Sequence, residues 1–251
     1  MDERDLRRAA LATLLLEQQQ EEVDRARRSD NQLSDDDKHR QAERIRQATS
    51  DTYTWLTRYT RTYNPHWKEQ KLESPYMPFP AWPFFPVLLE YLEEDDDLPK
   101  LIEKSRTMMV TWGIVGYFTL QAMVVPEREI VIQTMTSEKG EQPIDYAKAL
   151  YASQPQWLKD AFPLEKPIDK QPRNELRFGN GSVIFGIPAG AGKIRSYHPW
   201  GFFSDETAFQ EEAGAAYDEA LSACKKIVLN STASEGWYFD FLDDVEEVYN
   251  G

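Results

Sequence analysis

The first sixty residues carry apolar positions at helical spacing. Strong helix formers fill residues 2–28 without Gly or Pro, which predicts a helix, and the polar run 29–31 interrupts it. Ser34 then precedes three aspartates, as at a helix N-cap with an acidic first turn. Steps of three or four residues, or multiples of these, separate the next apolar positions, which are Ala42, Ile45, Ala48, Leu56 and Tyr59. We therefore expect a helical extension over residues 1–62, either packed on the rest of the chain or serving as an arm for a partner.

Residues 63–97 follow a different pattern, in which aromatic residues alternate with prolines. Because proline disrupts helix and sheet interiors, we expect residues 63–86 to be an extended lead-in. The apolar run 87–92 predicts a short helix, and the acidic run that follows it predicts a solvated turn. The rings of Trp82 and Phe84 could stack on a purine base, although such rings also serve as a hydrophobic cover for a sheet edge.

From residue 98 onwards, short apolar runs alternate with helical patterns. Strands are predicted at 100–103, 129–135, 174–178, 182–186, 201–206 and 226–230, and helices at 112–123, 144–158 and 217–223. The Gly-Asn-Gly sequence at 179–181 has turn chemistry, which predicts a hairpin between its flanking strands. This alternation is typical of an α/β fold with a doubly wound, mostly parallel sheet, which we place at residues 98–251.

The predicted strand at 201–206 ends in Ser204 and two adjacent carboxylates, Asp205 and Glu206. A buried parallel strand would carry these acids to the carboxyl edge of the sheet, where α/β proteins place their chemistry. In a nucleotide hydrolase, the first acid would bind Mg²⁺ and the second would orient and deprotonate the attacking water. A strand that runs into a solvated turn gives the same pattern. The choice between the two interpretations therefore depends on the segments before and after this strand.

A glycine-rich segment at residues 186–193 superficially matches a phosphate-binding loop. Its first glycine lies one residue too far from the Gly-Lys pair that ends the segment, and Ile194 replaces the hydroxyl that would bind Mg²⁺. The residues that follow cannot open a helix whose N-terminus would face phosphate. We therefore do not assign the phosphate site to this segment.

Residues 104–112 are the better candidate, because they leave a predicted strand and enter a predicted helix. Backbone N–H groups in such a turn can face a triphosphate. Lys104 would reach the phosphates from the strand, and Thr111 has the position of a Mg²⁺-binding hydroxyl. The loop lacks glycine and has Val110 in place of the usual lysine, so an ordinary strand-to-helix turn is the alternative.

Composition narrows the class of protein. The chain has 251 residues, 41% of them apolar, and a net charge of −14, which argues against tight passive binding to duplex DNA but not against a motor that grips DNA transiently. Its single cysteine, Cys224, excludes an internal disulfide and a cysteine metal site, as in a reducing cytoplasm. Without a long apolar run or a secretion signal, we expect a soluble protein that is not exported and does not bind a membrane.

Three segments, in this order, resemble the ATPase motifs of phage large terminase subunits. Residues 104–112 resemble the variant Walker A loop, in which the lysine stands at the front, and residues 202–208 resemble the Walker B strand. Residues 226–233 resemble the strand and polar turn called motif C, which couples hydrolysis to movement. The lead-in at 76–86 is similar to the segment that carries an adenine-binding motif in some of these proteins. The resemblance implies a P-loop ATPase core at residues 98–251.

The resemblance also implies a function, a motor that hydrolyses ATP with Mg²⁺ to move double-stranded DNA into a procapsid. The implied metal ligands are Asp205 and Thr111, and the implied catalytic residues are Glu206 as general base, Lys104 on the phosphates and Arg195. The implied ATP-binding residues are Lys104, Ser105, Arg106, Thr107, Met108, Met109, Val110, Thr111, Trp82 and Phe84, and the implied coupling residues are Asn230, Ser231 and Thr232.

Partners and location follow from the same resemblance. The motor would act in the host cytoplasm as a homo-oligomeric ring on the portal protein, with the small terminase subunit. Arg195 would enter the neighbouring subunit's site as an arginine finger, a role for which Arg106 competes within its own subunit. Four acids predict a solvated helical face rather than a nuclease metal cluster, namely Asp243, Asp244, Glu246 and Glu247. We therefore expect the ATPase portion alone, without a C-terminal nuclease domain and without DNA cleavage.

Two other functions stay open on the sequence alone. One is a helicase-like P-loop ATPase, although helicase motifs are not recognisable after residue 233. The other is a helical adaptor whose α/β body no longer hydrolyses ATP, which the glycine-free loop and Ser204 before the two acids would suit.

Overall fold

A computed structural model describes residues 34–64, 67–106, 108–135, 137–190, 194, 197, 199–232, 237, 238 and 240–242, with residues 137–140 as backbone only. The chain divides into two compact units, Met1–Gln47 and Ala48–Gly251. The helix expected at residues 2–28 and the four acids at 243–247 lie outside the described residues. In the part that is described, no helix is long and apolar enough to cross a membrane.

The first unit contributes helix α2, Asp35–Ala48, which begins where the sequence predicts it. The hydroxyl oxygen of Ser34 accepts a hydrogen bond from the Asp37 backbone N–H at 3.2 Å, and the hydroxyl donates to the Asp37 carboxylate at 2.7 Å. The second unit opens with α3, Thr52–Tyr59, where the Asp51 side chain caps the Thr54 N–H at 2.7 Å. Local capping by short polar side chains therefore sets the start of these two helices.

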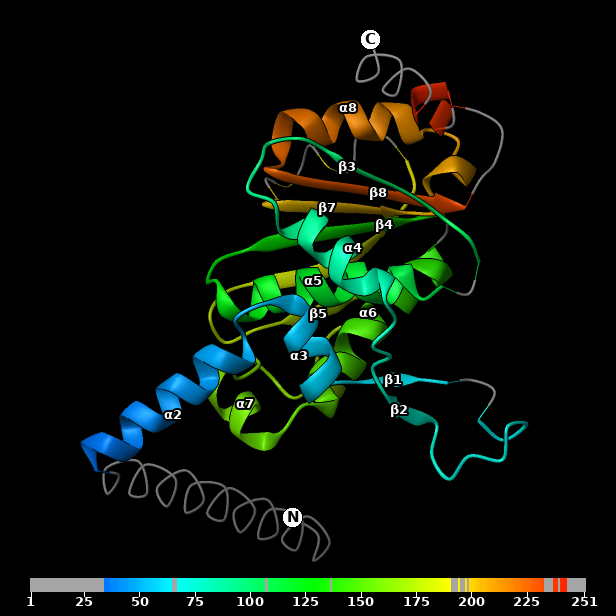
Figure 1. The fold of residues 1–251 in the computed structure, drawn as a ribbon. Helices are drawn as coiled ribbons and strands as arrows, with labels where there is room; N and C mark the ends of the chain where they lie inside the picture. The colour runs from blue at the N-terminus through cyan, green and yellow to red at the C-terminus, as the bar shows by residue number, and fades with distance from the viewer. Residues whose placement is uncertain are drawn as a thin grey trace, which may run out of the picture. The chain divides into compact units, whose positions relative to one another are not determined.

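The second unit is built on a six-stranded sheet in the order β3-β8-β7-β4-β6-β5 (Figure 1). Every neighbouring pair is parallel except β5 and β6, which form the predicted antiparallel hairpin. The strands are β3 (Lys100–Lys104), β4 (Glu129–Thr134), β5 (Glu175–Arg177), β6 (Val183–Pro188), β7 (Gly201–Asp205) and β8 (Lys226–Thr232). The predicted α/β class with a mostly parallel sheet is confirmed.

Helices cover both faces of this sheet (Figure 1). One face packs on α5 (Val110–Val124) together with α3, α4 (Phe84–Glu93) and α6 (Ser137–Ser153), in a core that includes Phe118, Phe203 and Val228. The other face packs on α8 (Ala213–Ala223) in a second core that includes Phe202 and Leu229. Because side chains alternate between faces along a strand, neighbouring residues of β7 and β8 serve different cores. β8 is buried throughout, and β7 is buried except at Asp205, its last residue.

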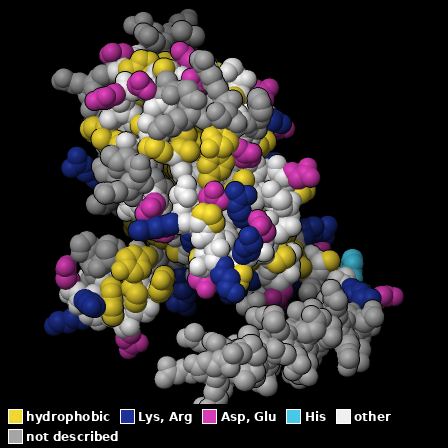
Figure 2. Space-filling model, turned by 180° about the vertical axis from the view of Figure 1, so that it is seen from behind, with side chains coloured by type: hydrophobic (Ala, Val, Ile, Leu, Met, Phe, Trp, Pro, Cys, Tyr) yellow, Lys and Arg dark blue, Asp and Glu magenta, His cyan; other side chains and the backbone are white. Residues whose placement is uncertain are grey.

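A second sheet, of two short strands, is separate from the six-stranded sheet. Strands β1 (Arg61–Tyr63) and β2 (Tyr76–Pro78) pair antiparallel and form an arm beside the sheet (Figure 1). Figure 2 shows hydrophobic side chains gathered on this arm, where Tyr63 and Tyr76 pack edge to face and each is nearly half exposed. The 3₁₀ turns η1 (Ile168–Lys170) and η3 (Thr207–Phe209) complete the described elements.

Proline positions correct two expectations. The segment at 63–86 is not extended throughout, because α4 (Phe84–Glu93) starts within it and holds Pro86 in its first turn, where a missing N–H costs nothing. The single helix expected at 144–158 is two helices, α6 (Ser137–Ser153) and α7 (Gln156–Ala161), separated at Pro155. Apolar spacing alone did not reveal that interruption.

Gly201, the first residue of β7, tests how tightly the helical layer packs on the sheet. A Cβ atom there would lie 2.7 Å from Cε1 of Phe118, which is fully buried. We expect Gly201→Ala to cost about 1–3 kcal/mol of unfolding free energy and about 2–10 °C in melting temperature. Gly214→Ala in α8 is the control, because its nearest neighbour, the Trp237 ring at 3.1 Å, is partly exposed and can move. Equal stability of both variants in thermal denaturation would contradict this packing.

Candidate active site

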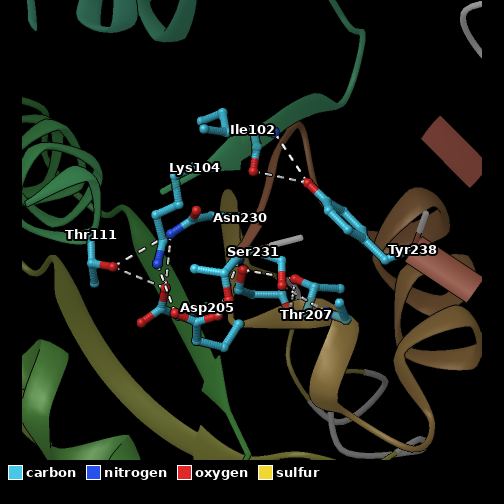
Figure 3. Close-up of polar contacts among 12 residues, drawn as sticks. Ile102, Lys104, Thr111, Asp205, Thr207, Asn230, Ser231 and Tyr238 are labelled. Carbon is cyan, nitrogen blue, oxygen red and sulfur yellow. Dashed lines mark hydrogen bonds and ion pairs between the residues drawn. The ribbon is translucent and has the colours of Figure 1, made fainter. Parts of the chain in front are cut away.

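The register of β8 with its two neighbours brings the candidate residues together. In the parallel ladders, Lys104 of β3 is opposite Thr232, and Asp205 of β7 is opposite Asn230. Lys104 and Asp205 are the last residues of their strands, so both lie at the carboxyl edge of the sheet. The edge that the sequence predicts for the site is the edge where these side chains meet (Figure 3).

The turn between β3 and α5 contains no glycine, yet one of its residues has a backbone conformation that favours glycine. Met109, immediately before α5, has the left-handed backbone conformation with φ of 54°. This conformation costs a non-glycine residue roughly 1–2 kcal/mol. The turn therefore stores a small amount of strain where the helix N-terminus opens towards the cavity, an arrangement common at functional sites.

Thr111, Asp205 and Asn230 form a polar cluster beside this turn (Figure 3). The Thr111 hydroxyl donates to Asp205 Oδ1 at 3.0 Å, and Asn230 Nδ2 donates to the same oxygen at 2.8 Å. Asn230 is fully buried, and its Oδ1 has no hydrogen-bond partner among the described atoms. The Thr111 hydroxyl and the Asp205 carboxylate are oxygen ligands of the kind that Mg²⁺ prefers, and Mg²⁺ usually keeps several waters as well.

Burial raises the pKa of Asp205 to about 6, although the nearby Lys104 charge and the Thr111 hydrogen bond act in the opposite direction. An uncompensated carboxylate in this position is costly, and a divalent cation would offset that cost. Among the described residues, no group of three or more His, Cys, Asp or Glu could hold a metal by itself. The cluster therefore fits a cation that shares its coordination with a polyphosphate rather than a closed structural metal site.

Glu206 lies directly after β7 and is held at both carboxylate oxygens. Lys104 Nζ is 2.7 Å from Oε1, while the Thr232 N–H and hydroxyl donate to Oε2 at 3.2 and 3.1 Å. Burial alone would raise the pKa of Glu206, but the hydrogen bonds from Lys104 and Thr232 outweigh it, so the pKa is lowered. Glu206 also has a left-handed backbone, with φ of 54°.

Lys104, Thr111, Asp205 and Glu206 line a cavity of about 890 Å³, a size typical of small-molecule sites. Of the implied ATP-binding residues, the cavity wall includes Lys104, Ser105, Met108, Met109, Val110, Thr111 and Trp82. Trp82 is 39% exposed and stacks on Phe85, with ring centroids 6.0 Å apart. Phe84 is not part of the wall, because its ring packs against Phe85 at 4.5 Å in the helical layer. The structure therefore brings one of the two expected rings to the cavity.

The remaining expected site residues have other positions. Arg106 is exposed and does not line the cavity. Thr107 and Arg195 lie outside the described residues, as do residues 191–193 of the glycine-rich segment. Ser231 is fully buried, and its hydroxyl oxygen accepts from the Ala208 N–H at 3.2 Å, in the turn that follows Glu206.

The sequence did not predict a further part of the cavity wall. It consists of Thr134, Met135, Gln142, Pro143 and Tyr146, at the end of β4, directly after it and in α6. Tyr146 stacks on Trp112, with ring centroids 4.0 Å apart, which ties α6 to the first turn of α5. Thr134 and Met135 could have been found by the rule that located Asp205, because they also end a parallel strand at the carboxyl edge.

No known protein family and no curated protein sequence matches the chain. Among solved structures, the chain is similar to the large terminase of bacteriophage HK97, with a TM-score of 0.60 and 13% identity, over 80% of this chain and 42% of that one. The two proteins share a fold. The ATPase domain of the large terminase of Thermus phage P74-26 matches with a TM-score of 0.43 and 9% identity, over 72% of this chain and 74% of that one. This chain spans less than half the length of the HK97 protein.

The raised pKa of Asp205 predicts a pH-dependent effect of its replacement. Between about pH 4 and about pH 6, the folded protein holds a proton on Asp205 that the unfolded chain has lost, so this carboxyl makes folding less favourable as the pH rises. Without metal, we expect Asp205→Asn to raise the unfolding free energy at about pH 7.5 by on the order of 1–3 kcal/mol, or about 2–10 °C in melting temperature.

The measurement is thermal denaturation of both proteins in EDTA between about pH 3 and about pH 7.5. The difference between variant and parent should shrink as the pH falls towards about 3, below the pKa of Asp205 in both the folded and the unfolded state. A variant that is less stable than the parent at neutral pH, or a difference that does not change with pH, would rule out a buried carboxylate as the cause.

Proposed function

We propose that this chain is the ATPase portion of a viral DNA-packaging motor, a large terminase subunit that hydrolyses ATP with Mg²⁺. One observation carries the proposal, the meeting of Lys104, Thr111, Asp205 and Glu206 at a single cavity. They come from the end of β3, the first turn of α5, the end of β7 and the residue after it, and each has the chemistry that phosphoryl transfer to water requires. The fold shared with the HK97 large terminase supports the same assignment.

Each side chain has a distinct task in this reaction. Thr111 and Asp205 would hold Mg²⁺, which neutralises phosphate charge when bound. The ammonium group of Lys104 would bind the terminal phosphates. Glu206 would take a proton from water as the water oxygen bonds to the terminal phosphorus and the bond from that phosphorus to the bridging oxygen breaks, giving ADP and phosphate.

Other residues of the cavity wall suit the base of the nucleotide. Trp82 and Met77 offer apolar surface, and the Asn64 and Gln70 side chains, hydrogen-bonded to one another at 2.8 Å, offer polar atoms. Flat apolar groups beside a few polar groups are typical of purine pockets. We propose that Trp82 contacts the adenine ring, whereas the position of Phe84 supports only an indirect role through packing.

Partners extend the proposal beyond the cavity. They are double-stranded DNA, the portal protein and the small terminase subunit, which the chain would meet in the host cytoplasm as part of a homo-oligomeric ring. Arg195, as an arginine finger from the neighbouring subunit, is part of the same proposal. DNA translocation into procapsids by the assembled motor is the direct test. Strand separation without packaging would instead favour a helicase-like ATPase.

Glu206→Gln and Lys104→Ala test the assignment of the site. We expect Glu206→Gln to lower kcat for ATP hydrolysis by about 100-fold or more while Mg-ATP still binds, because only the base is lost. Lys104→Ala should lower both kcat and affinity, because the phosphate contact is lost. The control is Glu103→Gln, which removes the same charge from an exposed neighbour on β3.

Steady-state hydrolysis and calorimetric titration with Mg-ATP measure these effects. If both site variants turn over ATP like the parent, the assignment is wrong. If the parent itself shows no Mg-ATP binding at millimolar concentration, the chain is an adaptor rather than a motor.

Trp82→Ala tests the base site. Removing a ring that contacts adenine should raise KM for ATP by about 5- to 30-fold with a smaller change in kcat, because stacking on a base contributes roughly 1–2 kcal/mol. Phe84→Leu is the matched control, since that ring packs in the helical layer and does not line the cavity. An equal rise in KM for both variants would show that the lead-in acts through packing rather than through contact with the base.

A further inference from the structure

Thr232, the last residue of β8, makes two of the hydrogen bonds that hold Glu206. Its backbone N–H and its hydroxyl both reach Oε2 of that carboxylate, at 3.2 and 3.1 Å. The other oxygen, Oε1, is bound by Lys104 Nζ at 2.7 Å. The two oxygens of Glu206 therefore have separate partners, one from β8 and one from β3.

We propose that Thr232 is a positioning residue for the general base, holding Oε2 so that Oε1 is the oxygen that takes the proton. The proposal rests on the proposed hydrolysis of ATP. In that reaction, Lys104 turns to the terminal phosphates and leaves Oε1 open to the attacking water. Among the described residues, the hydrogen bonds that then remain on the carboxylate come from Thr232.

The surroundings of Glu206 show why such a hold is needed. Its backbone is left-handed, with φ of 54°, and its side chain is about one-third exposed, so neither the backbone nor packing alone fixes the direction of the carboxylate. Thr232 is only 8% exposed and is fixed by the ladder, in which it lies opposite Lys104. A rigid donor on the neighbouring strand can thus orient a base whose own position is strained.

The turn that carries Glu206 is fixed by the same strand. Ser231 accepts a hydrogen bond from the Ala208 N–H at 3.2 Å, and Gln210 donates to the Asp205 carbonyl oxygen at 2.9 Å. The backbone on both sides of Glu206 is therefore tied down, and its side chain is tied separately by Thr232. This separation allows the side-chain contact to be removed without releasing the turn.

Thr232→Val removes the hydroxyl and keeps the shape, whereas Thr232→Ser keeps the hydroxyl. We expect kcat for ATP to fall by about 10- to 100-fold in Thr232→Val, with KM for ATP within about twofold of the parent, because a hydrogen bond to a charged group is lost while nucleotide contacts remain. Thr232→Ser should restore most of kcat. Thr119→Val is the control, an isosteric change at a buried threonine of α5 whose hydroxyl bonds only to the Val115 carbonyl oxygen.

A second measurement separates positioning from a purely structural role. If Thr232 acts through Glu206, the double variant Thr232→Val with Glu206→Gln should hydrolyse ATP at the residual rate of Glu206→Gln alone. A further loss in the double variant, a kcat of Thr232→Val within about twofold of the parent, or a Thr232→Ser variant as slow as Thr232→Val would each overturn the proposal.

Failure of the proposed function gives a different result. If Glu206→Gln itself keeps the parent rate, the hydrolytic site is wrongly assigned and the positioning role falls with it. If Glu206→Gln is inactive while Thr232→Val is not, the ATPase assignment stands and only the role of Thr232 is refuted.

Discussion

The site depends on the register of β8 between β3 and β7. Lys104 and Asp205 are opposite Thr232 and Asn230, so a single strand supplies polar contacts to the phosphate-loop side and to the acidic side at once. A slip of one residue would turn the side chains of β8 to the opposite face of the sheet and would break both sets of contacts. Burial on both faces prevents such a slip, because apolar residues of β8 fill both cores. The packing that fixes the register of β8 therefore also fixes the geometry of the site.

The same register places the charged groups of the site next to an opposite charge or to hydrogen-bond donors. Lys104 has an ion pair with Glu206, and Asp205 accepts hydrogen bonds from Thr111 and Asn230. In the proposed reaction, a polyphosphate would compete with the Glu206 carboxylate for the ammonium group of Lys104. Nucleotide binding would then free Glu206 Oε1, the oxygen that Lys104 contacts, so that binding and activation of the base would be linked.

Much of this arrangement could be predicted from the chain, because it follows from local patterns. Buried strands show as apolar runs, and the acids after β7 and the lysine at the end of β3 stand where such runs stop. The prolines at 86 and 155 mark the first turn of α4 and the break between α6 and α7, so these two boundaries could have been predicted from the sequence. The position of Phe84 away from the cavity could not be predicted, because tertiary packing decides it. The bonds from Thr232 to Glu206 were equally hidden, since they depend on how strands distant in sequence align.

Met109 gives the glycine-free turn a further property. Glycine would adopt the left-handed conformation at this position without strain, but it would also let the turn sample many other shapes. Packing against the helical core holds Met109 in this conformation, and its side chain leaves the backbone fewer alternative conformations than glycine would. In the proposed function, the amide groups at the start of α5 would therefore have one orientation before phosphate binds, and less conformational entropy would be lost on binding.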